Sequence, residues 1–124
     1  MLKAMRTPIL TALAIGALAM PALADTYPVS GRWGQSASQV KGTIDCSNRR
    51  VISFYGDQRT DSSGGVPAYR NKSVTKVGSG YRIVDVFTNG QINNAQVVYT
   101  MSITDDNRVA LSGQTGAIKL QRCQ

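Results

Sequence analysis

Apolar and polar residues alternate in short stretches along most of the chain, and this period of two is typical of strands with one buried face. The clearest stretch is residues 95–104, in which Val97, Tyr99 and Met101 fall on one face and polar side chains fall on the other. Comparable stretches predict eight strands, near residues 29–33, 39–46, 50–55, 66–77, 81–88, 95–104, 108–112 and 116–123.

Short turns rich in Gly, Asn, Asp and Ser separate the later strands, at residues 78–80, 89–90, 105–107 and 112–114. Such short links make neighbouring strands antiparallel, so a meander is predicted for the second half of the chain. Residues 56–65 are polar and Gly-rich, and we expect a long loop there. The pattern predicts either a small antiparallel meander barrel or a two-sheet sandwich, and the barrel is favoured because closure removes unpaired strand edges.

Composition supports the all-β class. Residues 25–124 contain 11 Val and 6 Ile but only 2 Leu and no Glu. The β-branched residues favour strands, and strong helix formers are scarce. A segment of this length has room for one hydrophobic core, so a single domain is predicted for residues 25–124.

The first 24 residues have the pattern of a secretory signal peptide. Lys3 and Arg6 precede an apolar run over residues 9–20, and the sequence Ala22-Leu23-Ala24 forms a small-residue cleavage site. The run is shorter than the ~20 residues needed to span a bilayer. We therefore expect cleavage after Ala24, no transmembrane segment in the mature chain, and secretion, most simply to a bacterial periplasm.

The two cysteines can add a covalent cross-link to the fold. In an oxidising compartment, Cys46 and Cys123 are expected to form one disulfide, with free thiols or half of a metal site as the alternatives. If alternation continues to the end of the last strand, Cys123 lies on the face opposite Leu120, whereas Cys46 shares a face with Ile44. A bulge or a frayed end is then needed to bring the two cysteines together.

Several classes of chemistry are absent from the sequence. The chain has no His, and all seven acidic residues are Asp. Histidine-dependent triads and imidazole zinc sites are thereby excluded, and no glycine-rich phosphate loop is present. We expect no catalytic residue, no metal and no cofactor.

Asp85 stands out because it shares a face with apolar residues such as Ile83 and Phe87. A buried carboxylate needs a partner, and the candidates are Arg70, Arg82 and Arg122. Two interpretations stay open, a structural ion pair and a polar contact inside a ligand cavity. An enzyme built on Asp85 with Lys or Tyr is the remaining catalytic hypothesis.

The excess positive charge is concentrated in one segment. The whole chain carries a formal charge of +7, and residues 48–82 contain seven basic residues against two Asp. If the strands of this segment are neighbours, they form a basic face with aromatic residues, whose candidate binding residues are Arg49, Arg50, Tyr55, Arg59, Tyr69, Arg70, Lys72, Lys76 and Arg82. Such a face would attract an anionic lipid, a glycan or another envelope component, while nucleic acid is not expected outside the cytoplasm. The alternative is a solvated surface that keeps the protein soluble.

The tripeptide Gly31-Arg32-Trp33, at the start of the predicted first strand, resembles the Gly-x-Trp motif of lipocalin-type barrels. The resemblance implies that Trp33 closes one end of the barrel and that Arg122 stacks on it. In size, leader and motif the chain is most similar to the small periplasmic barrels that inhibit secreted metalloproteases. Those inhibitors close a short disulfide loop near their start, whereas the second cysteine here is almost at the C-terminus.

Three functional hypotheses follow. The first is a non-enzymatic binding module for an anionic or amphipathic ligand or envelope component. The second, implied by the resemblance, is a periplasmic protease inhibitor that inserts residues 25–30 into a secreted protease. The third is a structural or interaction protein of the cell envelope.

Overall fold

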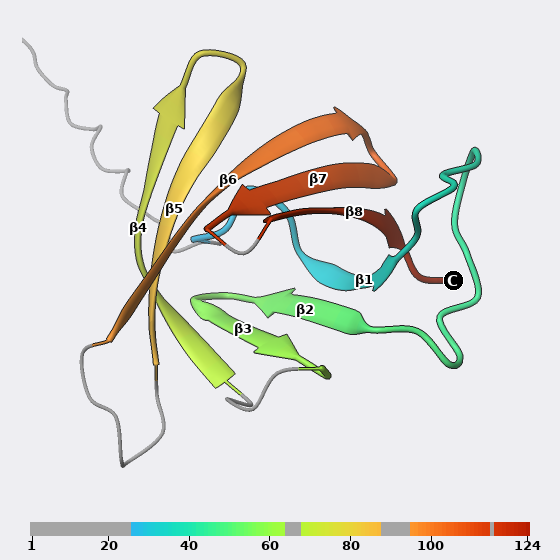
Figure 1. Ribbon diagram of the computed structural model, residues 1–124, viewed down its shortest axis with the longest axis horizontal. Coiled ribbons are helices and arrows are strands. Elements are labelled where there is room, and N and C mark those ends of the chain that lie inside the picture. The colour runs from blue at the N-terminus through green and yellow to red at the C-terminus, as the bar shows by residue number, and fades with distance from the viewer. Residues whose placement is uncertain (1–25, 64–67, 88–94, 115) are drawn as a thin grey trace, which may run out of the picture.

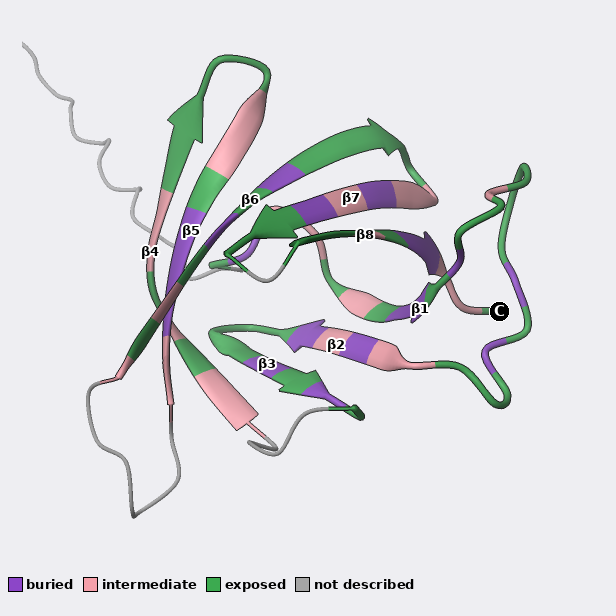
Figure 2. Ribbon diagram, in the orientation of Figure 1, coloured by how far each residue is buried: buried purple, intermediate pink, exposed green. Residues whose placement is uncertain are grey.

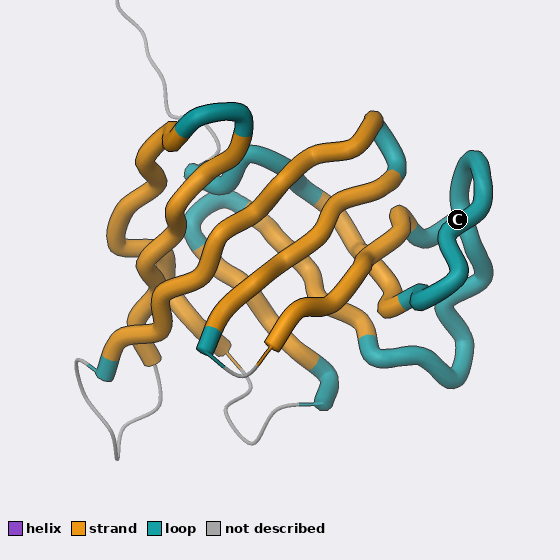
Figure 3. The backbone as a smooth tube through the Cα atoms, turned by 45° about the horizontal axis from the view of Figure 1, so that its top comes forward, coloured by secondary structure: helices purple, strands orange, loops and turns teal. Residues whose placement is uncertain are grey.

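The computed structural model describes residues 26–63, 68–87, 95–114 and 116–124. Within them lie eight strands: β1 (Gly31–Gln35), β2 (Val51–Tyr55), β3 (Gln58–Asp61), β4 (Ala68–Val77), β5 (Gly80–Phe87), β6 (Gln96–Asp105), β7 (Arg108–Gly113) and β8 (Gly116–Arg122). Each strand pairs with the next in antiparallel fashion, and β8 pairs with β1, so the sheet closes into a barrel (Figures 1 and 3). The predicted all-β class and antiparallel meander are confirmed, and the architecture is a barrel, not a sandwich.

The barrel interior holds the core. Buried residues alternate with less buried ones along β2 and β7, as the purple and pink bands on these strands show in Figure 2. The fully buried apolar residues include Phe54, Ile83, Met101 and Val109. Each buried side chain of this kind stabilises the folded protein by about 1.5–3 kcal/mol, so this interior is the main source of stability.

The prediction of a long loop at residues 56–65 is wrong for the residues that the structure describes there. Gly56 adopts a φ of 60°, which suits a tight turn, and the chain returns at once as β3. The two residues of β3 that point inward are Arg59 and Asp61. Because these are charged, the apolar alternation that marks the other strands is absent from this one.

The predicted strand at 39–46 is also wrong. Apart from an isolated bridge between Ile44 and Cys123, these residues form no β pairing, and they pass outside the barrel next to β8. The Gln121 side chain holds them there, because its Nε2 donates to the carbonyls of Val40 at 2.6 Å and Gly42 at 2.8 Å. In Figure 1 the segment between β1 and β2 runs alongside the C-terminus.

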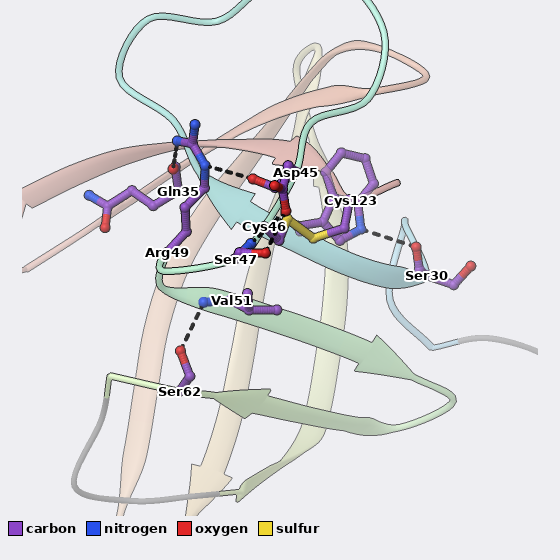
Figure 4. Close-up of a disulfide and its surroundings, with 10 residues drawn as sticks. Ser30, Gln35, Asp45, Cys46, Ser47, Arg49, Val51, Ser62 and Cys123 are labelled. Carbon is purple, nitrogen blue, oxygen red and sulfur yellow. Dashed lines mark hydrogen bonds between the residues drawn. A yellow bond between two sulfur atoms is a disulfide. The ribbon is translucent and has the colours of Figure 1, made fainter.

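The disulfide joins Cys46 to Cys123 across 77 residues, as predicted. Figure 4 shows the bond beside β1, with Arg49 nearby donating to the carbonyls of Asp45 and Gln35. The predicted bulge or frayed end is unnecessary. Since Cys46 belongs to a segment outside the barrel, it meets Cys123 without any change in the alternation of β8.

One end of the barrel is closed by Trp33 and Arg122. Trp33 is fully buried, and its Nε1 donates to the carbonyl of Ser30 at 3.0 Å. The guanidinium carbon of Arg122 lies 4.4 Å from the Trp33 ring centroid. Arg122 also donates to the carbonyls of Asp106 and Ser30, which fastens the chain before β1 to the β6–β7 turn.

Candidate functional site

A cavity of about 440 Å³ opens at the other end of the barrel, where β6 and β8 begin. One part of its wall is apolar and is formed by Ile52, Val97, Leu111 and Ile118. The other part is polar and is formed by Arg50, Arg59, Asp61, Tyr69 and Tyr99. A concave site of this size, lined by both kinds of side chain, is typical of small-molecule binding.

Asp85 on β5 lies behind the polar wall and is completely buried. Its carboxylate accepts four hydrogen bonds, one from each of four residues. The donors are Tyr27 Oη at 3.0 Å, Tyr99 Oη at 2.8 Å, Asn71 Nδ2 at 3.1 Å and Arg59 Nε at 2.7 Å. This set satisfies the buried charge, because every donor is aimed at the carboxylate oxygens.

The two tyrosines of this group donate to Asp85 as neutral phenols at neutral pH. Burial raises the pKa of both Tyr27 and Tyr99 well above the ordinary value, and the negative charge of Asp85 adds to the rise. Arg59 lowers both, but by less than the sum of the other effects. Both phenols therefore remain protonated and keep their hydrogen bonds to Asp85.

Arg59 links this polar group to the cavity. Its residue is only 6% exposed, and its guanidinium carbon lies 3.8 Å from the Tyr69 ring centroid and 5.0 Å from that of Tyr99. Only Nε is used by Asp85, and among the described residues neither Nη nitrogen has a hydrogen-bond acceptor. A buried guanidinium with donors unsatisfied by the protein is costly unless another molecule accepts from them.

A second ion pair stands at the mouth of the cavity. Arg50 binds Asp61 in a bidentate manner, with Nε to Oδ1 at 3.0 Å and Nη2 to Oδ2 at 2.6 Å. Burial alone raises the pKa of the Asp61 carboxyl, but the hydrogen bonds from Arg50 and Ser63 outweigh this effect and leave the pKa below its ordinary value. Asp61 is therefore ionised at neutral pH.

The predicted partner of Asp85 is wrong. Arg70 and Arg82 are exposed, and Arg122 lies at the closed end of the barrel over Trp33. Arg59 takes the role because β3, which was expected to be a loop, places it on the inner face of the sheet.

The candidate binding residues do not gather on one face. Arg50, Arg59 and Tyr69 line the cavity, whereas Arg70 and Lys72 line a second hollow with Val86 and Gln96, and only Gln96 lines both. The others are spread over the exterior. Arg49 is beside the disulfide, Tyr55 is 57% exposed at the end of β2, Lys76 lies 5.0 Å from the Tyr81 ring centroid, and Arg82 is exposed on β5.

Sequence reasoning missed Tyr27, Asn71, Asp61 and Tyr99 as members of the site. Tyr99 was on the apolar face of its predicted strand, so its inward direction could be read from the sequence, but its hydrogen bond could not. Tyr27 is separated from Asp85 by 58 residues, and no local pattern marks that contact.

The residues before β1 are packed onto the barrel. Tyr27 is 3% exposed, its ring centroid lies 4.9 Å from that of Phe54, and Thr26 donates to the carbonyl of Gly56. Of the tail predicted to insert into a protease, residues 26–30 thus follow the barrel surface and interior, and residue 25 lies outside the described residues.

Neither a cluster of three potential metal-ligating residues nor a helix that is long and apolar enough to cross a membrane is found in the parts of the chain that the structure describes. Comparisons with models of protein families, with curated proteins and with solved structures found no match to this chain.

Proposed function

We propose that the protein is a non-enzymatic binding module that holds a small amphipathic ligand in the open end of the barrel. The observation that carries this proposal is the buried Arg59, which lines a cavity that a ligand can enter and whose two Nη donors find no acceptor among the described residues. A polar group on the ligand would accept from these donors, and an apolar part would pack against Leu111 and Ile118.

Two further observations support this assignment. The cavity volume of about 440 Å³ lies in the range of ~300–1,000 Å³ that is usual for ligand pockets. Asp85 accepts hydrogen bonds from three neutral donors besides Arg59, so Nε alone of the guanidinium completes its set of donors. The remaining donors are thereby left for another molecule.

We further propose that the protein works outside the cytoplasm, as a component of the periplasm or cell envelope. The leader pattern of residues 1–24 and the Cys46–Cys123 disulfide support this localisation. The contact between Trp33 and Arg122 supports the resemblance to lipocalin-type barrels, although a shared barrel says little about the ligand.

The protease-inhibitor alternative receives no support from the described residues. Tyr27 is held inside the barrel by Asp85 and Phe54. Withdrawal of Tyr27 would remove one of the hydrogen bonds that Asp85 accepts.

The proposal is tested by titration with N-phenyl-1-naphthylamine, an uncharged amphipathic fluorophore that brightens in apolar sites. Ile118→Trp fills the cavity at a half-buried position, and Ala117→Trp adds the same side chain at the exposed neighbouring position of β8. We expect saturable binding by the wild type and by Ala117→Trp, and at least a tenfold weaker Kd for Ile118→Trp with an unchanged circular dichroism spectrum. Absence of binding by the wild type, or equal binding by both variants, would refute the proposal.

A further inference from the structure

The ionised groups around the cavity are already balanced within the protein. Arg59 is paired with Asp85 at 2.7 Å, and Arg50 with Asp61 at 2.6 Å. Both carboxylates are buried, with side-chain exposures of 0% and 5%. The described lining of the cavity contains no other Lys, Arg or Asp.

A negatively charged ligand group would disturb this balance. At the Nη donors of Arg59, a carboxylate would stand across the same guanidinium from Asp85, and the described lining of the cavity offers no unpaired cation to offset it. Like charges that share one site oppose each other, and a desolvated anion without a full counter-charge is costly. An uncharged carbonyl oxygen accepts the same hydrogen bonds and adds no charge.

The position of Arg59 also restricts how the acceptor approaches. The Tyr69 ring lies against the guanidinium, with its centroid 3.8 Å from the guanidinium carbon. The Nη donors point within the guanidinium plane, so an acceptor reaches them along the edge of the group. A carbonyl at the end of an apolar chain satisfies this geometry, with its chain directed towards Leu111 and Ile118 on the apolar wall.

From these observations, and resting on the proposed function, we infer that the ligand's polar group is an uncharged carbonyl acceptor, that of an ester, amide or ketone. The cavity selects such a ligand over the corresponding free acid. The basic surplus of the sequence does not determine this choice, because the two arginines at the cavity are neutralised and exposed basic residues such as Arg82 lie elsewhere.

The test compares decanamide and methyl decanoate with decanoate at pH 8, where the acid is ionised, by displacement of bound N-phenyl-1-naphthylamine from the wild-type protein. We expect both uncharged compounds to bind at least tenfold more tightly than decanoate. Equal or tighter binding of decanoate, or failure of all three to displace the fluorophore, would overturn this inference and leave the proposed function standing. Failure of the fluorophore itself to bind would instead count against the proposed function.

The charge argument is tested separately with Asp85→Asn, which leaves Arg59 without its counter-charge. We expect the preference for decanamide over decanoate to fall at least tenfold in this variant. Asp105→Asn removes the same charge from the pair with Arg108 at the closed end of the barrel and should leave the preference unchanged. An unchanged preference in folded Asp85→Asn would overturn the charge argument, and the wild-type comparison decides the selectivity even where Asp85→Asn does not fold.

Discussion

Arg59 and Asp85 meet inside the barrel, 26 residues apart in the sequence, with Nε of the arginine 2.7 Å from Oδ2 of the aspartate. Both residues are buried, on β3 and β5, and only β4 separates the two strands in the sheet. Buried pairs of this kind contribute little net stability compared with apolar residues, but removal of one partner leaves an uncompensated charge. The pair therefore makes the interior sensitive to the loss of either residue.

Arg59→Met should lower the free energy of unfolding by about 3–5 kcal/mol, because Asp85 remains buried without its cation. The double variant Arg59→Met/Asp85→Asn should recover part of this loss, since no buried charge is left. Urea unfolding followed by circular dichroism measures both. Arg108→Met breaks an exposed pair and provides the control, for which we expect a much smaller effect. A double variant as unstable as Arg59→Met would show that the buried charge is not the cause.

The two buried tyrosines predict a loss of stability at alkaline pH. Their pKa values are raised in the folded state, so their contribution is fully present below the unfolded value of ~10 and is lost as the pH rises above it. Absorbance at 295 nm should show that Tyr27 and Tyr99 ionise only as the barrel unfolds. Tyr27→Phe should lower by one the number of tyrosines that ionise together with unfolding. Ionisation of Tyr27 and Tyr99 with an intact circular dichroism spectrum would contradict the account.

Asp61 predicts a loss of stability in acid. Its pKa is lowered in the folded state, so its contribution is present above the unfolded value of ~3.9 and is lost as the pH falls below it. Arg50→Gln removes the hydrogen bonds from Arg50, which contribute most to the lowered pKa of Asp61. The fall in the urea midpoint between pH 6 and pH 2 should then be smaller in this variant than in the wild type. Parallel curves for the two proteins would mean that the Arg50–Asp61 pair does not cause the effect.

The disulfide should stabilise the barrel through the long loop that it closes. Cys46→Ala/Cys123→Ala is expected to lower the free energy of unfolding by up to about 4.5 kcal/mol in the chain-entropy model. Gly34 lies under the bond, and a Cβ built there would come within 2.6 Å of the Cys46 sulfur. Gly34→Ala should therefore lower the free energy of unfolding more when it is introduced into the oxidised wild type than when it is introduced into Cys46→Ala/Cys123→Ala. Equal losses of unfolding free energy in the two backgrounds would rule out a collision with the sulfur.

The strand order could be predicted wherever the inward residues are apolar. Seven of the eight predicted strands overlap with strands of the structure, and the disulfide pairing is confirmed. The two errors have different physical origins. In β3 the inward residues are charged, so apolar alternation does not mark the strand. At residues 39–46 the side chain of Gln121 binds the backbone in place of a neighbouring strand, and Val40 is left 56% exposed.

The site could be predicted only in part. Asp85 was identifiable as a polar residue on an apolar face, and Arg59 belonged to the basic segment. Their pairing depends on the register of β3 with β4 and of β4 with β5, which no single stretch of sequence encodes. The contribution of Tyr27 depends on the path of the chain before β1, where alternation carries no information.

The most direct test of the central claim is native mass spectrometry of the protein purified without reductant from an exporting host, side by side with Ile118→Trp. After incubation with a lipid extract of the cell envelope, we predict a retained uncharged amphipathic molecule on the wild-type chain, released on denaturation, and none on Ile118→Trp. A bare wild-type chain, or an equal adduct on both proteins, would contradict a ligand site in the barrel.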